Sequence, residues 1–284
     1  MSDVFDIKTT LERYRGYVER AKEELFAVFD SRRDAVFYER QLQVMQEDRF
    51  FHWVTSQALK ELLQERRINS ELMALGYEAE SAGPTLPDDW ETGTNIRFYW
   101  SVRNRYWRAK ARAILKLVRA YSEPELARSY GRQGEMMFDA ALPKAGFLPV
   151  GENTNEYAGR RWDRSGHNLD RIFERDGVGF GVEIKNRLRY IEPKELRIKL
   201  EMCKFLGLKP VFVTRMMPKL YIYEVAEKWG GFSLVFKHQL YPFHLGKFAK
   251  QLREELGLPI DCPHAIERGT IERFLNWHLR ELRK

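Results

Sequence analysis

The chain has 284 residues, enough for one large domain or two smaller ones with a sizeable core. With 44% hydrophobic and 31% charged residues, the composition is that of a globular protein and excludes an intrinsically disordered one. The formal net charge of +7 favours polyanionic partners, although ribosomal proteins, membrane-surface proteins and ordinary enzymes share such a charge.

The sequence also predicts the cellular compartment of the protein. No apolar run approaches the roughly 18 residues of a membrane span, and no signal peptide opens the sequence. Its two cysteines, Cys203 and Cys262, form no Cys-x-x-Cys motif and have no zinc-type spacing to the six histidines. We therefore expect an intracellular, cytoplasmic protein with reduced thiols and no membrane partner.

Residues 1–50 alternate in charge and carry apolar residues at helical spacing, which predicts an amphipathic helix with a packing role. These apolar residues are Leu11, Tyr14, Val18, Ala21, Leu25 and Val28. A second helical stretch is expected at about residues 33–46. A third helix is expected within residues 51–68, with Thr55 or Ser56 as its N-cap and an apolar stripe of leucines. The stripe consists of Leu59, Leu62 and Leu63.

A polar loop rich in Gly, Pro, Thr and Asp follows at residues 81–94, and residues 96–100 have strand composition. Helices, a loop and a strand in this order resemble a winged-helix DNA-binding domain; a purely structural helical domain is the alternative. In the winged-helix interpretation, the helix beginning near Thr55 would enter the major groove. Its polar side would carry Gln57, Lys60, Gln64 and Arg67.

The segment from residue 97 to residue 119 contains eight basic residues and no Asp or Glu, interleaved with Tyr and Trp. Its basic residues are Arg97, Arg103, Arg105, Arg108, Lys110, Arg112, Lys116 and Arg119. Spread round a helix, such charges can follow a phosphate backbone. The alternatives are a solvated linker helix, or a basic amphipathic helix that binds a membrane or a partner.

Ser122-Glu123-Pro124 predicts an N-cap followed by proline in the first helical turn. We therefore expect two domains: a mainly helical, winged-helix-like nucleic-acid-binding domain over residues 1–121 and a second domain over residues 122–284. The second domain is expected to begin with a helix to about residue 145, either continuous or broken near residues 131–134, and a strand from residue 147. Further helices are expected at residues 193–206, 247–256 and 266–282, and strands at 209–214 and 232–237. The fold class is thus α/β (α+β), with a mixed sheet flanked by helices.

Asp176-Gly177 predicts a tight hairpin, because both residues tolerate the positive φ of a type I′ turn. With these two residues in the loop, Arg175 pairs with Val178. Counting back along both strands then places Asp170 directly opposite Glu183.

The two-residue period of a strand assigns the side chains of this hairpin to two faces. One face, with Leu169, Arg171 and Phe173 opposite Ile184, Val182 and Phe180, is largely apolar and should pack on a core. The other face carries Asp170, Glu183 and Lys185, with Gly179 and Gly181 beside them, so we expect space for a ligand there. Two carboxylates opposite each other destabilise a sheet unless a cation lies between them. A solvated face with unrelated charges is the alternative, but the register, the glycines and Lys185 favour a metal site.

The pattern of Asp170, then twelve residues, then Glu183-Ile184-Lys185 resembles the PD-(D/E)XK nuclease superfamily. The proline that often precedes the Asp is replaced here by Leu169. The flanking segments strengthen the likeness. Residues 131–147, which include Glu135, resemble the family's first helix, and residues 194–215 resemble its second helix and the strand after it. The similarity covers roughly residues 122–260 and is greatest to archaeal Holliday-junction resolvases and Mrr-type endonucleases.

This resemblance implies a restriction-endonuclease-like fold and a DNA endonuclease that depends on Mg²⁺, with Mn²⁺ as a substitute. Asp170 and Glu183 would hold the metal, with the backbone carbonyl of Ile184 as a third ligand. Glu135 would complete the shell or hold a metal-bound water. Lys185 would position the nucleophile or stabilise charge on the phosphate. On the N-terminal half, we expect the DNA contacts to come from Arg103, Arg105, Arg108, Arg112, Lys60 and Arg67.

Other functions remain open at this point. One is a DNA-binding protein that keeps the nuclease fold without catalysis; another is a nuclease that acts on RNA, or on a junction or flap in preference to linear duplex. Because related nucleases often pair two subunits, a homodimer is also considered. DNA as the substrate would associate the protein with the nucleoid. His167, three residues before Asp170, could touch substrate, although a loop histidine bonded to nearby groups is more common.

Overall fold

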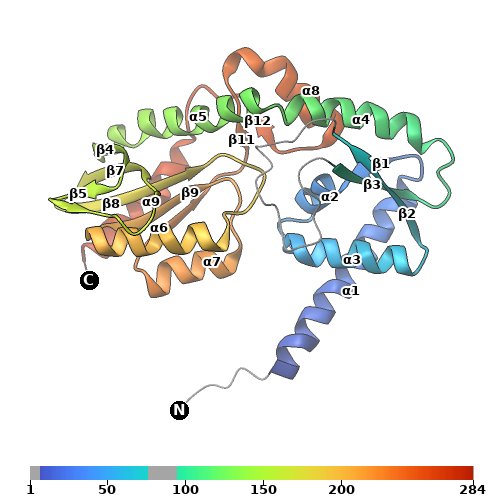
Figure 1. Cartoon of the computed structure of the whole chain (residues 1–284), viewed down its shortest axis with the longest axis horizontal. Helices are drawn as coiled ribbons and strands as arrows, with labels where there is room; N and C mark the ends of the chain where they lie inside the picture. The colour runs from blue at the N-terminus through green and yellow to red at the C-terminus, as the bar shows by residue number, and fades with distance from the viewer. Residues whose placement is uncertain (1–6, 76–94, 284) are drawn as a thin grey trace. The chain divides into compact units, whose positions relative to one another are not determined.

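The computed structural model describes residues 7–75 and 95–283, with side chains from residue 14 onward. The chain divides into two compact units (Figure 1). Unit 1 comprises Met1–Ala127 and Gln251–Leu258, and unit 2 comprises Arg128–Lys250 and Pro259–Lys284. The sequence-based boundary after residue 121 lies close to the first of these divisions, whereas the sequence does not predict the return of residues 251–258 to unit 1.

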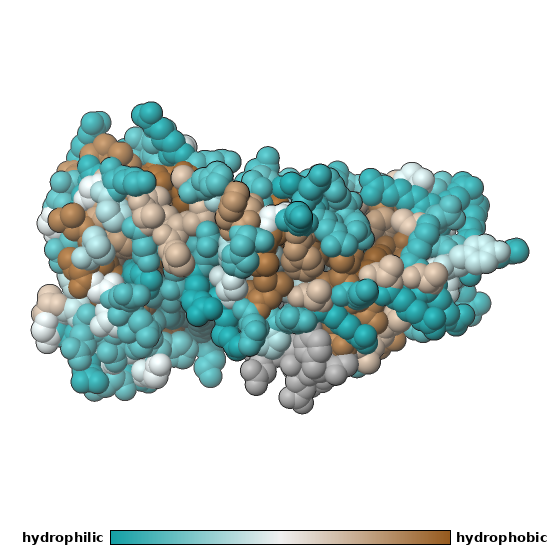
Figure 2. All heavy atoms as spheres, turned by 90° about the horizontal axis from the view of Figure 1, so that it is seen from above, coloured by the Kyte–Doolittle hydropathy of each residue, from teal (hydrophilic) through white to brown (hydrophobic). Residues whose placement is uncertain are grey.

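The described residues form a mixed α/β structure, which confirms the predicted fold class. None of the described helices combines the length and apolar character needed to cross a lipid bilayer. On the face drawn in Figure 2, hydrophilic side chains predominate and apolar side chains occur in patches between them.

Unit 1 combines helices with a small antiparallel sheet of strand order β1-β3-β2. Its elements are α1 (Ile7–Ser31), β1 (Val36–Tyr38), α2 (Glu39–Met45), α3 (His52–Gln64), β2 (Ile68–Ala74), β3 (Asn95–Ser101) and α4 (Trp107–Tyr121). The core lies between α1, α3 and β3, and includes Val18, Leu25, Leu59 and Leu62, each at most 2% exposed. The predicted stripe of α3 and that of α1 from Val18 to Val28 are therefore confirmed, whereas the side chain of Leu11 lies outside the described residues. Tyr14, at 38% exposure, lies outside this core.

Two local predictions for unit 1 are wrong. Residues 36–38 form strand β1 instead of the first turns of a helix, because they pair with β3. Helix α3 starts at His52, so Thr55 and Ser56 lie inside it and do not cap it. Their hydroxyl groups donate to buried acceptors of the preceding segment, Gln46 Oε1 at 3.2 Å and Glu39 Oε1 at 2.7 Å. The predicted polar loop at 81–94 lies outside the described residues.

Unit 2 contains most of the helices and strands that follow residue 127. Its helical elements are α5 (Pro124–Ala141, which begins in unit 1), η2 (Pro143–Ala145), α6 (Pro193–Leu206), α7 (Lys219–Tyr223), the π-helical η3 (Glu224–Lys228), η4 (Phe243–Leu245), α8 (Gly246–Leu256, shared with unit 1) and α9 (Arg268–Glu281). Its strands are β4 (Leu148–Thr154), β5 (Glu156–Tyr157), β6 (Arg160–Arg161), β7 (Leu169–Arg175), β8 (Val178–Lys185), β9 (Lys209–Thr214), β10 (Phe232–Val235), β11 (Gln239–Leu240) and β12 (Ile260–Asp261).

The main sheet of unit 2 has the strand order β10-β9-β8-β7-β4. Strands β4, β7 and β8 are antiparallel, whereas β8, β9 and β10 run parallel. A parallel pair needs a crossover connection, and α6 supplies it between β8 and β9. Helices α5 and α9 cover one face of the sheet, where Phe138 and Phe274 pack near Phe180. Helix α6 covers the other face, where Leu200 packs with Phe212.

From Arg171–Val182 to the turn, the hairpin between β7 and β8 has the predicted register; the predicted pairing of Asp170 directly opposite Glu183 lies beyond the end of this ladder. Arg175 pairs with Val178, Phe173 with Phe180 and Arg171 with Val182. Asp176 and Gly177 have φ values of 50° and 74°, as a type I′ turn requires. The predicted face of Leu169 is wrong, because Leu169 packs on the α6 side with Cys203. The ladder ends at Arg171–Val182, and strict alternation of the side chains no longer holds before it.

The glycines of β8 leave no open space for a ligand. A Cβ atom at Gly181 would lie 2.5 Å from Cys203 Sγ and 2.9 Å from Leu169 Cδ1. A Cβ atom at Gly179 would lie 2.7 Å from Leu208 Cδ2. These glycines therefore allow α6 and its C-terminal loop to approach the sheet closely, which corrects the expectation of an empty face.

Gly181→Ala should lower the free energy of unfolding by about 1–3 kcal/mol, because the added methyl group overpacks the interface between β8 and α6. Gly131→Ala, on α5 with nothing within 4 Å of the new Cβ, is the matched control and should be neutral or stabilising. Urea unfolding of both variants measures the difference. Equal stability of Gly181→Ala and wild type would show that the interface can shift.

Candidate active site

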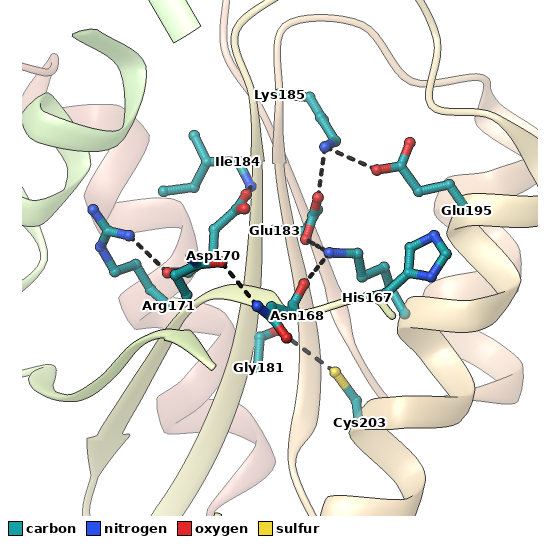
Figure 3. A network of polar contacts seen from close by, with 12 residues as sticks. His167, Asn168, Asp170, Arg171, Gly181, Glu183, Ile184, Lys185, Glu195 and Cys203 are labelled. Atoms are coloured by element: carbon teal, nitrogen blue, oxygen red, sulfur yellow. Dashed lines mark hydrogen bonds and ion pairs between the residues drawn. The ribbon is translucent and has the colours of Figure 1, made fainter. Parts of the chain in front are cut away.

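Asp170 and Glu183 lie on the adjacent strands β7 and β8 (Figure 3). Asp170 Oδ2 accepts a hydrogen bond of 2.7 Å from the backbone N–H of Ile184, which brings its carboxylate against β8 beside Glu183. Glu183 is only 2% exposed. The hairpin turn thus brings together two acids that are separated by twelve residues in the sequence.

Glu183 is flanked by two lysines, one on each of its carboxylate oxygens. Lys185 Nζ lies 2.6 Å from Glu183 Oε1 and 2.9 Å from Oε1 of Glu195 in the first turn of α6 (Figure 3). Lys199 Nζ, from further along α6, lies 2.6 Å from Glu183 Oε2 and donates a hydrogen bond to the carbonyl of Asn168. The four side chains form a row of alternating charge: Glu195, Lys185, Glu183, Lys199.

Burial and charge shift the pKa values of these groups in opposite directions. Burial raises the pKa of Glu183 and of Asp170 above their ordinary values, and the neighbouring lysines only partly offset it. Burial alone would lower the pKa of Lys185, but Glu183, Glu195 and Asp170 outweigh it and raise that pKa. The pKa of Glu195, which burial would raise, is lowered by Lys185. The site therefore favours the charged form of Lys185 and disfavours the charged forms of Asp170 and Glu183.

Glu135, the acid expected from the first helix, lies on α5 and is held by Arg171. Its Oε2 is 3.4 Å from Arg171 Nη2. The same guanidinium donates three hydrogen bonds to Asp139, and its Nη2 lies 3.2 Å from Glu152 Oε1. Arg171 is buried as predicted, but it lies among acids on the α5 side of the sheet. The charge of Glu135 still reaches Asp170, whose pKa it helps to raise.

The donor atoms present suit a hard cation with few protein ligands. In the part of the chain that the structure describes, no group of three or more His, Cys, Asp and Glu side chains is placed to hold a metal ion. Mg²⁺, however, commonly uses one or two carboxylates and keeps several waters. Glu183 Oε2 is buried, and the Lys199 ammonium group lies 2.6 Å from it. A buried carboxylate that already attracts two ammonium groups, beside Asp170, supplies oxygen donors that fit such a cation.

The backbone of Ile184 belongs to the same arrangement. Its N–H donates to Asp170, and in an extended strand the N–H and C=O of one residue point toward the same side of the strand. We therefore expect its carbonyl, the third ligand implied by the resemblance, to face the side of Asp170. His167 lies nearby, with Nδ1 3.2 Å from Ser165 Oγ.

The sequence reasoning missed Glu195, Lys199 and Asn186. Glu195 and Lys199 are spaced i, i+4 on a helix that was predicted with the correct bounds, so a crossover helix placed over β8 could have suggested them. Asn186 directly follows Lys185 and is 1% exposed. Its Nδ2 donates to the carbonyls of Tyr130 and Leu240, and its Oδ1 accepts from the N–H of Leu240. This side chain ties the end of β8 to α5 and β11.

Asn186→Ala should lower the free energy of unfolding of unit 2 by roughly 2–4 kcal/mol, because it leaves buried backbone groups of Tyr130 and Leu240 without their hydrogen bonds. Arg187→Ala, at the exposed neighbouring position, should change it by less than about 0.5 kcal/mol. Denaturant unfolding followed by circular dichroism compares the two variants. A similar decrease in both would mean that the Asn186 bonds contribute little.

The residues expected to contact nucleic acid all lie in unit 1 but on several elements. Lys60 is exposed on α3, whereas Arg67 follows that helix and stacks its guanidinium 3.7 Å from the ring centre of Phe26. Arg103 and Arg105 lie in the turn before α4, and Arg108 and Arg112 lie on α4. These four arginines are exposed. The basic segment is therefore a strand end, a turn and a helix, and the expectation that its charges are spread round one helix is corrected.

Three comparisons with known proteins, against family models, curated proteins and solved structures, found no match to this chain.

Proposed function

We propose that this protein is a Mg²⁺-dependent nuclease that hydrolyses phosphodiester bonds in DNA. The observation that carries the proposal is the meeting of Asp170, Glu183 and Lys185 on one strand pair, with the carboxylate of Glu183 buried there. This is the set of side chains that the PD-(D/E)XK resemblance requires. The sheet, with α5 and α6 on opposite faces, is also of the kind that the resemblance implies.

In this proposal Asp170 and Glu183 hold the cation, and the carbonyl of Ile184 adds a backbone ligand. When bound, Mg²⁺ polarises the scissile phosphate and lowers the pKa of a coordinated water. Lys185, kept charged by Glu183 and Glu195, directs its ammonium group toward a phosphate oxygen or the attacking water. Glu135, whose Oε2 contacts Arg171, would act from α5 as an outer residue that orients water.

Asp170→Asn, Glu183→Gln and Lys185→Ala should each lower the rate of DNA cleavage by at least about 100-fold, because each removes a group that acts on the reacting phosphate. DNA affinity should stay the same or rise for the two acid variants, since each removes a negative charge near phosphate. Labelled linear, branched and single-stranded DNA and RNA, with and without Mg²⁺, measure cleavage. Glu201→Gln, at an exposed position of α6, is the control.

Cleavage by Asp170→Asn or Glu183→Gln at the wild-type rate would place the active site elsewhere. A wild-type protein that binds DNA but cuts no substrate would favour the second candidate, a non-catalytic DNA-binding protein with a nuclease fold. One observation favours that candidate: two lysines already neutralise Glu183, and Arg171 holds Glu135. Cleavage of RNA or of junctions alone would narrow the substrate class, and a homodimer would allow two strands to be cut.

For unit 1 we propose a winged-helix-like role in DNA binding. The order helix, strand, helix, helix, strand, strand, with β1 paired to β3, supports this proposal because winged-helix domains share it. Helix α3, with Lys60 exposed, would then be the helix for the major groove. The exposed arginines at the start of α4 would contact phosphates.

Changing Arg103, Arg105, Arg108 and Arg112 together to Gln should flatten the slope of log affinity against log salt concentration by about one unit for each phosphate that the variant no longer neutralises. Binding should weaken for all DNA sequences alike. The control makes the same charge change at four exposed arginines of unit 2, Arg268, Arg273, Arg280 and Arg283, and should leave the slope unchanged. Equal slopes for the first variant and wild type would assign the basic segment to another role.

A further inference from the structure

Lys199 is a charged residue in a buried, mainly apolar part of unit 2. It lies on the side of α6 that faces the sheet, and it is only 5% exposed. Its neighbours Leu196, Leu200 and Cys203 are buried apolar residues. A lysine in such a place is costly unless its charge is paired and its donors are bonded. Its partners should therefore explain why a cation is present here.

The partners of Lys199 are a carboxylate of the site and the backbone that leads into the site. Nζ lies 2.6 Å from Glu183 Oε2 and donates to the carbonyl of Asn168, two residues before Asp170. By contrast, the other lysine of the site, Lys185, divides its charge between Glu183 and Glu195. Lys199 therefore balances Glu183 from the side of α6 and at the same time fixes the start of β7.

We propose that Lys199 is a built-in counter-cation, which keeps Asp170 and Glu183 in place without metal and competes with the divalent cation for Glu183. This inference rests on the proposed metal site. A cation bound to Glu183 Oε2 and Asp170 lies within a few ångströms of the Lys199 ammonium group, so the two positive charges repel each other. Because the Asn168 carbonyl also holds Lys199, the lysine keeps one partner when the cation takes the other.

Lys199→Gln separates this role from simple packing. Removing the charge ends the repulsion and leaves Glu183 less compensated without metal. The variant should bind Ca²⁺ or Mg²⁺ at least about tenfold more tightly than wild type, and its metal-free melting temperature should fall. Isothermal titration calorimetry with each ion alone, in the absence of DNA, measures the affinity. Thermal unfolding with and without metal measures the second effect, independently of cleavage.

Two further variants serve as controls. Lys199→Arg keeps the charge and should bind metal with an affinity close to that of wild type. Lys194→Gln removes a lysine from an exposed position of the same helix and should change neither affinity nor melting temperature. A Lys199→Gln protein that is unfolded without metal but folds on addition of Ca²⁺ supports the proposal.

The inference is wrong if Lys199→Gln binds metal no more tightly than a metal-binding wild type, or stays unfolded at every metal concentration. Either result would make Lys199 a purely structural residue. Failure of the proposed metal site looks different: neither wild type nor any Lys199 variant binds a divalent cation. If wild type binds the divalent cation weakly and the Lys199→Gln variant binds it well, the result supports both the metal site and the role of Lys199.

Discussion

The burial of Glu183 between β8 and α6 is the constraint on which the described site depends. An isolated carboxylate in this position would be driven to its neutral form, and burial does raise its pKa. Two lysines compensate its charge: Lys185, two residues further along β8, and Lys199 from α6, which covers the strand. Since Lys185 is itself held by Glu195, the charge balance extends across the whole interface between strand and helix. Removing any one of these groups changes the environment of the others.

The sheet topology makes this arrangement possible. A parallel connection from β8 to β9 requires a crossover, and α6 forms it directly over Glu183. The close approach depends on Gly179 and Gly181, which have no side chains to hold the helix away. On the opposite face, Arg171 gathers Glu135, Asp139 and Glu152 next to α5. The hairpin thus carries one charge cluster on each face. Asp170 is influenced by both, because Lys185 and Lys199 from one cluster and Glu135 from the other shift its pKa.

These features suit a site that acts on phosphodiesters. A cationic lysine held in the charged state beside two oxygen donors can meet both the charge of a phosphate and a hard metal ion. In the proposed metal site, the same lysines that stabilise the acids would also limit how strongly the acids attract metal. In this view the affinity for the divalent cation is set by the balance between Asp170, Glu183 and the lysines, and is therefore open to change by single substitutions.

Local sequence signals determined the pieces of this site. Asp176-Gly177 set the turn and hence the register up to Arg171–Val182, which brings the next residue, Asp170, against β8. The predicted helix at 193–206 is confirmed as α6, with Pro193 in its first turn and Gly207 as its left-handed C-cap. Only the tertiary structure decided what covers Glu183, because Lys199 and Glu195 reach it across a crossover whose path no local pattern describes. It also decided that the glycines admit a helix instead of a ligand, that Leu169 turns toward α6, and that Arg171 holds Glu135. The physical reason is that turns and helix ends depend on the backbone preferences of adjacent residues, whereas charge compensation and close packing depend on residues that folding alone brings together.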